Sequence, residues 1–419
     1  MFILQSATHA AILGASLVAA ASGNAVNINN GGPAEVSSAF KKLSGAAAHT
    51  ALHDSSARCN ASRCHQNTRT KYLDNLELWM LGEGGDYEGN RFIWLHGGAG
   101  VGKSAIMQSI VERCTQHGVI LGTFFFSRMD ISRNFAEVLI PTLAYQLAGA
   151  FPEAMAILAP IIHRDPLIFT ASLRTQVREL LVRPILYLVD IGVIGNTVGL
   201  RRVFVIDGLD ECSDPQQQAL VIEVVASMLN AHHIPFHFLI SSRFEVAISN
   251  AFQKASGGHE SFASISLDHD YDATSDIGHF IADSFRDIVK LHPLRADIPE
   301  NWPSPRAIDN LKWRTSGLFI HAATVMKFIA SPDGNPARLL QVVEELELSP
   351  MGNPFGQPEE LYLHFLTSAK YTKEVHRTQT KCTCTKLDYS PAEVLYVTIG
   401  ILLVSAITVI GLAFAAKKI

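Results

Sequence analysis

The chain has 419 residues, of which 48% are hydrophobic and 17% are charged. This length exceeds a single ordinary core and suits two or three domains. The formal net charge is −5, so the composition offers no general basic attraction for DNA or RNA, and we expect no nucleic-acid partner. Six cysteines are too few for a disulfide framework, which favours a reducing compartment.

The first 90 residues precede the strongest patterns in the chain. Residues 1–23 are apolar, but they lack a basic start and are interrupted by polar side chains, which favours a retained segment over a cleaved signal peptide. Polar and glycine-rich residues follow, as in a linker. We therefore predict a leader and linker over residues 1–38. A helical segment is predicted over residues 39–90, where residues 72–81 show helical spacing of apolar side chains.

Strands and helices alternate between residues 91 and 270. Nearly continuous apolar runs indicate buried strands, and apolar residues three and four positions apart indicate helices. Strands that alternate with helices form a parallel sheet covered on both faces, so the predicted fold class is α/β. The predicted strands are residues 91–96, 119–126, 202–206 and 236–241, and the predicted helices are residues 103–117, 135–150, 172–183 and 215–230.

Beyond residue 270 the strand patterns stop. Amphipathic patterns predict a small helical domain over residues 271–347, and a basic linker follows over residues 348–393. Residues 394–416 contain no charge, Pro, Asn or Gln, and a helix of that length spans roughly 30 Å of hydrocarbon. We therefore predict a C-terminal transmembrane helix. The alternative is a tail altered by a wrong gene boundary.

The predicted membrane helix has a direction. Basic residues are more numerous before it than after it, and the more basic side of a span stays in the cytosol. The preceding domains are therefore expected in the cytosol, anchored by a single-pass tail.

The stretch GGAGVGKS matches the pattern G-x-x-x-x-G-K-[ST] between a predicted strand and a predicted helix. Glycines permit backbone angles that point successive N–H groups at phosphate oxygens, and the helix N-terminus adds positive potential. Lys103 would reach the β and γ phosphates, and the Ser104 hydroxyl would bind Mg²⁺. The predicted phosphate-binding residues are Gly97, Gly98, Ala99, Gly100, Val101, Gly102, Lys103 and Ser104.

A second motif, RRVFVIDGLDEC, places acids at the end of a buried strand. A carboxylate there is costly unless a cation meets it, so Asp207 is predicted to hold Mg²⁺ together with Ser104. Either Glu211 or Asp210 would orient and deprotonate the attacking water. The alternative is a solvated acidic turn that opens the helix at Pro215.

Two arginines end further strands. Arg243 follows the strand FLISS, where a polar side chain would lie near the γ-phosphate and sense its presence. Arg128 follows FFFS and offers a second cation. For each arginine the alternative is a surface salt bridge.

Together these segments resemble fungal NACHT-domain proteins, NLR-like NTPases of the STAND class whose nucleotide domain is also described as nephrocystin-like. The resemblance rests on TRTKYLDNLELWM, FIWLHGGAGVGKSAI, FFFSRMD, VFVIDGLDEC, FLISSR and SGLFIHAATVMKFI, in this order, and covers residues 39–347. The segment ILGASLVAAASGN also loosely resembles the leader of basidiomycete members.

The resemblance implies a P-loop NTPase that binds ATP or GTP with Mg²⁺, hydrolyses it slowly and forms homo-oligomers on activation. It assigns phosphate binding to Gly102, Lys103 and Ser104, the metal to Asp207, and hydrolysis to Asp210 and Glu211. Arg243 matches the sensor position. No repeat array follows, unlike in many members. A non-hydrolysing membrane-tethered scaffold, a truncated paralogue without sensor repeats and a metabolic kinase therefore stay open as alternatives.

Overall fold

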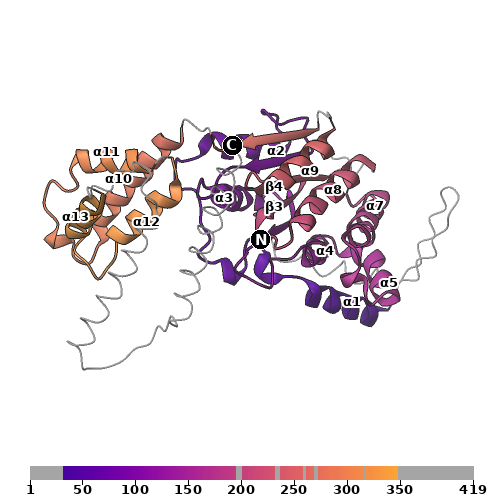
Figure 1. Cartoon of the computed structure of the whole chain (residues 1–419). Coiled ribbons are helices and arrows are strands. Elements are labelled where there is room, and N and C mark those ends of the chain that lie inside the picture. Colours follow the sequence, from indigo (N-terminus) through magenta and orange to yellow (C-terminus); the bar gives the residue numbers. More distant parts are fainter. Residues whose placement is uncertain are drawn as a thin grey trace, which may run out of the picture.

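The computed structural model describes residues 32–194, 201–231, 236–257, 261–268, 272–315 and 317–347 (Figure 1). Most of the predicted leader, the predicted basic linker and the predicted transmembrane helix lie outside these residues. No helix in the described ranges combines the length and the apolar character that a membrane span requires. The transmembrane helix over residues 394–416 therefore stays a prediction.

Five strands form one sheet in the order β2-β3-β4-β1-β5, and every neighbouring pair is parallel. The predicted parallel α/β sheet is thereby confirmed. Strand β4 lies between β1 and β3, so the end of β4 separates the glycine-rich loop from the acidic strand end. The strands are β1 (Phe92–His96), β2 (Ile120–Phe125), β3 (Arg202–Asp207), β4 (Phe236–Ser242) and β5 (Phe262–Ser266).

Alternate residues of each strand feed two separate cores, because successive side chains point to opposite faces of a sheet. On β3, Val203 and Val205 pack on one face, whereas Phe204 and Ile206 pack on the other. All four side chains are fully buried, which explains why this strand has an uninterrupted apolar sequence.

Two helices, α2 (Thr70–Leu81) and α3 (Lys103–Thr115), cover the face to which Val203 and Val205 point. The other face is covered by a larger layer, in which α4 lies against β2 and α8 against α9 (Figure 1). That layer consists of α1 (Pro33–Ala46), α4 (Leu139–Ala150), α5 (Met155–Arg164), α6 (Leu173–Gln176), α7 (Arg183–Asp190), α8 (Pro215–Ala231) and α9 (Val246–Ser256).

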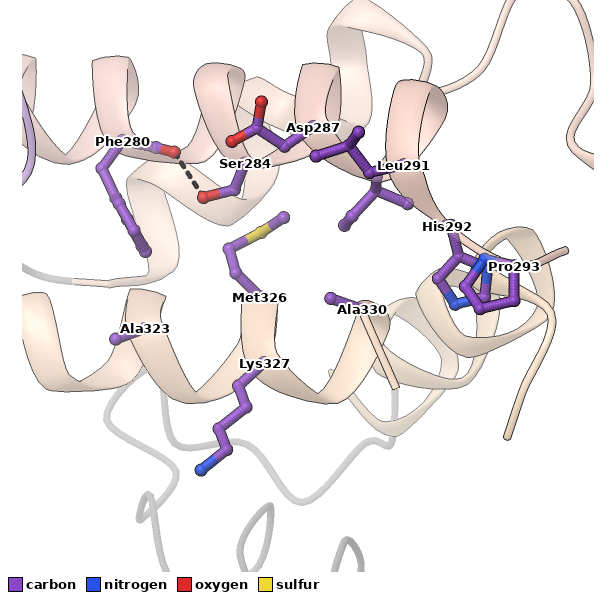
Figure 2. Close-up of a pocket in the computed structure, with 11 residues that line it drawn as sticks. Phe280, Ser284, Asp287, Leu291, His292, Pro293, Ala323, Met326, Lys327 and Ala330 are labelled. Atoms are coloured by element: carbon purple, nitrogen blue, oxygen red, sulfur yellow. Dashed lines mark hydrogen bonds between the residues drawn. The ribbon is translucent and has the colours of Figure 1, made fainter. Parts of the chain in front are cut away.

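The last four helices enclose a third core of their own and are called the helical unit below. A cavity of about 450 Å³ opens between its first and third helices, with Phe280 and Met326 among its lining residues (Figure 2). None of the predicted phosphate-binding residues lines this cavity. The helical unit consists of α10 (Ala273–Leu291), α11 (Pro305–Arg314), α12 (Phe319–Ile329) and α13 (Pro336–Glu347).

Two local predictions need correction, and one strand was missed. The predicted linker ends early, because Pro33 starts α1, where its fixed φ and missing N–H suit a first helical turn. The predicted helical segment from residue 39 breaks after Ala46 into 3₁₀ turns. Strand β5 was not predicted. It pairs only with β1 in the described sheet and is half exposed, so its sequence lacks a continuous apolar run.

Candidate functional site

The glycine-rich loop connects β1 to α3, as predicted. Gly100 has φ +78° and Gly102, at the N-cap of α3, has φ +102°, a region that other residues rarely adopt. The motif lysine and serine are therefore the first two residues of the helix. A helix N-terminus reached through such a loop presents free N–H groups and positive potential, which favours an anion.

Lys103 is folded back onto this loop. Its Nζ donates to the carbonyl oxygen of Gly97 at 2.7 Å and to that of Gly98 at 2.8 Å. Burial lowers the pKa of Lys103, and the nearby charge of Asp210 opposes that shift. The ammonium group thus lies inside the loop, within reach of any anion that the loop holds.

Asp207 ends β3 and is 3% exposed. Ser241 Oγ, at the end of β4, donates to Asp207 Oδ1 at 2.5 Å, and the Ser104 hydroxyl lies close enough to lower the pKa of this carboxylate. Burial nevertheless raises the pKa of Asp207. The structure therefore brings together Ser104 and Asp207, the two residues that sequence reasoning paired.

A hydroxyl and a carboxylate fit Mg²⁺, which binds through one or two protein oxygens plus phosphate oxygens. The described residues contain no group of three or more His, Cys, Asp or Glu side chains that would form an all-protein metal cage. Ser104 and Asp207 would hold such an ion jointly with a ligand.

Asp210 and Arg243 form an ion pair in which Asp210 is buried and Arg243 is partly exposed. Asp210 is 2% exposed, and it accepts Arg243 Nε at 3.1 Å and the Arg243 backbone N–H at 2.9 Å. The arginine that was predicted as a phosphate sensor therefore neutralises one of the two predicted hydrolytic acids. Because its carboxylate is engaged on both oxygens, Asp210 is the less available base of the two.

Among the residues that the structure describes, Glu211 has no cationic partner of this kind. Its Oε2 accepts the backbone N–H of Arg128 at 3.0 Å, whereas the Arg128 guanidinium donates to the Asp210 carbonyl oxygen at 3.0 Å. Burial raises the pKa of Glu211, and the charges of Asp210 and Asp207 raise it further. A carboxylate with a raised pKa near a phosphate site has the properties of a general base.

Sequence reasoning missed Asp268. Its Oδ1 accepts the Gly98 N–H at 2.6 Å, which places a carboxylate against the loop that is shaped for phosphate. The residue lies just beyond β5, the strand that was not predicted, so no motif pointed to it.

The helical unit also reaches the loop. The backbone N–H of Ile320, at the start of α12, donates to the Gly100 carbonyl oxygen at 3.2 Å. Arg69, which lies just before α2, is 3% exposed. Its guanidinium donates a hydrogen bond to the Val101 carbonyl oxygen at 2.7 Å. The same guanidinium lies 4.9 Å from the ring centroid of Phe319, the first residue of α12. The Arg69 backbone N–H donates to Asp276 Oδ2 at 2.8 Å. No local sequence pattern indicates these contacts, because each joins segments that are far apart in the chain.

Comparison with known proteins gives evidence on the site that is independent of the geometry above. Residues 70–243 match the family Nephrocystin 3, N-terminal, which is less than half of the 419 residues. This segment contains the glycine-rich loop and the acidic strand end. No curated protein matches the chain.

Two solved structures resemble the fold distantly. The structure of PCH-2 from C. elegans gives a TM-score of 0.36 at 11% identity, covering 75% of this chain and 73% of that chain. The structure of the ORC1 protein of Aeropyrum pernix, solved in complex with DNA, gives a TM-score of 0.38 at 14% identity. The match covers 77% of this chain and 81% of that chain. Residues 70–243 are thus similar to the family Nephrocystin 3, N-terminal, and this match together with the geometry supports a nucleotide-binding NTPase domain.

Proposed function

We propose that this protein is a signalling NTPase of the NACHT type, which binds ATP or GTP with Mg²⁺ and hydrolyses it slowly. The observation that carries the proposal is the meeting of Lys103, Ser104 and Asp207 at one edge of the sheet. A phosphate-binding loop, a lysine and a metal-binding acid are the parts that phosphoryl-transfer sites share.

Binding requires Lys103 to exchange its two carbonyl acceptors for phosphate oxygens, which are stronger, charged acceptors. Ser104 and Asp207 would hold Mg²⁺, and the ion would neutralise charge that develops on the phosphates.

Hydrolysis is assigned to Glu211. Its carboxylate would take a proton from the attacking water as the water oxygen bonds to the γ-phosphorus, while the bond from that phosphorus to the bridging oxygen breaks. The raised pKa of Glu211 makes it a better proton acceptor than an ordinary carboxylate. Arg243 would keep Asp210 in place beside it.

The proposed switch runs through the helical unit. Gly100 and Val101 of the loop accept hydrogen bonds from Ile320 and Arg69, so a loop that reshapes around phosphate also moves these partners. We propose that this movement exposes or hides a surface through which copies of the chain assemble.

Turnover and oligomeric state, measured together on the full-length chain, test this function. We expect Mg²⁺-dependent phosphate release that Glu211→Gln reduces at least about a hundredfold while nucleotide stays bound, as for a lost general base. We also expect the mass of the assembly to differ between triphosphate and diphosphate. Binding without turnover in the wild type would instead support a non-hydrolysing scaffold, and phosphorylation of another molecule would support a kinase.

A further inference from the structure

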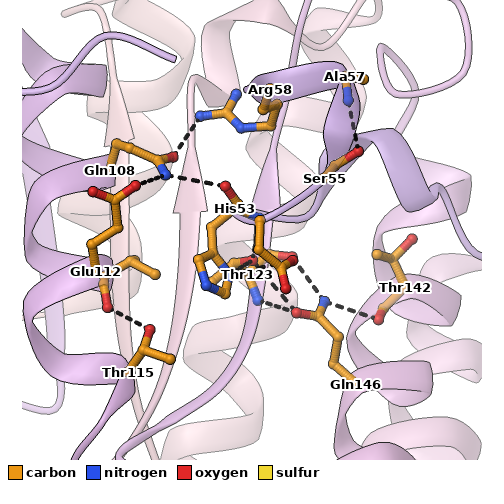
Figure 3. A network of polar contacts seen from close by, with 12 residues as sticks. His53, Ser55, Ala57, Arg58, Gln108, Glu112, Thr115, Thr123, Thr142 and Gln146 are labelled. Carbon is orange, nitrogen blue, oxygen red and sulfur yellow. Dashed lines mark hydrogen bonds and ion pairs between the residues drawn. The ribbon is translucent and has the colours of Figure 1, made fainter. Parts of the chain in front are cut away.

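Arg58 lies beside the proposed phosphate site without belonging to any motif. It ends the 3₁₀ turn Ser56–Arg58, which packs this part of the chain against β2. Its Cζ is 3.7 Å from the ring centroid of Phe125, the last residue of β2, and its guanidinium donates to Gln108 Oε1 at 2.9 Å (Figure 3). The cation is therefore fixed at two points, one on the sheet and one on α3.

Gln108 is itself held rigidly. Its Nε2 donates to the His53 carbonyl oxygen at 3.1 Å and to Glu112 Oε1 at 2.6 Å, so both ends of the amide are engaged (Figure 3). Because Gln108 is 1% exposed, its acceptor oxygen has little freedom to leave Arg58.

The sheet register places Arg58 near the acidic strand end. Phe125 on β2 is the register partner of Asp207 on β3. Both point to the α3 face, because Phe125 packs there with Val205, two residues before Asp207. The charge of Asp207 is the largest influence opposing the burial that lowers the pKa of Arg58 to about 10.

The position of Gln108 on α3 also places Arg58 near the proposed phosphate site. Gln108 lies four residues after Ser104 on α3, so the two side chains share one helix face about one turn apart. Arg58, bonded to Gln108, thus lies on the side of α3 that carries the motif hydroxyl.

One donor of this guanidinium is unsatisfied. The Arg58 Nε atom is buried and has no hydrogen-bond partner among the described residues. A buried donor without an acceptor destabilises the folded chain, most of all when it is charged, so an acceptor that arrives with a ligand would relieve this cost. A phosphoryl oxygen is the acceptor best matched to a guanidinium.

We propose that Arg58 donates to the terminal phosphate of a nucleoside triphosphate held by the glycine-rich loop and thereby distinguishes triphosphate from diphosphate. This inference rests on the proposed function, because it takes the nucleotide to lie between Lys103 and Asp207. The competing role is mechanical, in which Arg58 only fastens its own segment to α3 and β2.

Affinities of the full-length chain for ATP, ADP, GTP and GDP, each with Mg²⁺, separate these roles. For Arg58→Gln we expect at least a tenfold loss of triphosphate affinity and less than a threefold change for diphosphate. Arg58→Lys keeps the charge and should recover part of the preference. Arg63→Gln is the matched control, since Arg63 is an exposed arginine of the same segment, paired with Glu112 at 2.9 Å, and should change neither affinity.

Equal losses for triphosphate and diphosphate in Arg58→Gln, or no loss for either, would overturn the proposal and leave the mechanical role. Equal wild-type affinities for the two ligands would also overturn it. The proposed function fails separately, when wild type binds no nucleotide or when Lys103→Ala binds as tightly as wild type. In either case no phosphate is held by the glycine-rich loop beside Arg58, so the proposed function and the proposed role of Arg58 are both wrong.

Discussion

At the scale of single residues, Gly100 has the least room for a side chain among the glycines that the structure describes. Its φ of +78° is strained for any side chain, and an added Cβ would lie 2.3 Å from Ile320 Cγ2. Gly98 offers a matched comparison, because its Cβ would meet Asp268 at an ordinary 3.5 Å and its φ is not positive. The two glycines of one loop therefore have different tasks.

We predict that Gly100→Ala lowers the free energy of unfolding by at least about 2 kcal/mol, from left-handed backbone strain plus the clash with α12. Gly98→Ala should cost less than about 1 kcal/mol. Urea unfolding of both variants checks this. Similar losses in the two variants would show that the loop and α12 are not in contact.

Asp268 is the second residue with a separable effect. Its carboxylate occupies the Gly98 N–H at 2.6 Å and repels a phosphate that approaches the same loop. We predict that Asp268→Asn tightens nucleotide binding about threefold to tenfold at low salt, with a smaller gain at high salt because the exposed charge is screened. Nucleotide titrations of wild type and variant at two salt concentrations measure this gain in affinity. Weaker binding by the variant would mean that the carboxylate supports the shape of the loop instead.

At the scale of elements, the contacts of Arg69 join three parts of the chain. The side chain reaches Val101 of the loop, and the backbone N–H reaches Asp276 on α10. We predict that Arg69→Ala weakens nucleotide binding about tenfold, because the loop carbonyl loses its partner. Arg113→Ala is the control: this residue of α3 makes partly exposed ion pairs with Asp74 and Glu77 of α2, worth about 1 kcal/mol or less, and should leave the affinity unchanged. Equal effects in calorimetric titrations of the two variants would contradict the special role of Arg69.

The elements differ in how far their sequences predict them. The strand, loop and helix between residues 92 and 115 follow from local patterns, namely a buried apolar run, glycines with a Lys-Ser pair, and helical spacing. Strand β5 and helix α9 do not follow, because β5 is a half-exposed edge of the described sheet and α9 has no motif to mark it. Burial that depends on distant partners leaves a weak local signal.

The residues of the candidate site also differ in how far the sequence predicts them. Lys103, Ser104 and Asp207 were predictable, since each belongs to a motif with a physical requirement. Asp268 was not, because its partner Gly98 lies 170 residues away in the sequence. The pairing of Arg243 with Asp210 was likewise hidden, since only the order of the strands brings β4 next to β3.

At the scale of the whole molecule, one partly buried histidine links stability to pH. Burial lowers the pKa of His237 to about 3 from 6.5, and the charges of Arg201 and Arg91 add to this shift. Protonation therefore favours the unfolded chain. The contribution of His237 is fully present above pH 6.5 and is lost as pH falls from there towards 3.

We predict that this residue alone costs about 1.4 kcal/mol of stability between pH 7.5 and pH 5.5. His237→Phe should remove that part of the pH dependence while leaving the rest. Unfolding curves at the two pH values measure the difference, and an unchanged pH dependence in the variant would show that His237 is already accessible to protons in the folded chain.

The central claim is that the glycine-rich loop binds nucleotide, and its most direct measurement is a calorimetric titration of the full-length chain with ATP and with GTP, each with and without Mg²⁺. Lys103→Ala and the exposed-lysine control Lys71→Ala are titrated in parallel. We predict Mg²⁺-dependent binding of at least one triphosphate by the wild type and the control, and none that is measurable by Lys103→Ala. Wild-type affinity retained in Lys103→Ala, or no binding of either nucleotide by the wild type, would contradict the account.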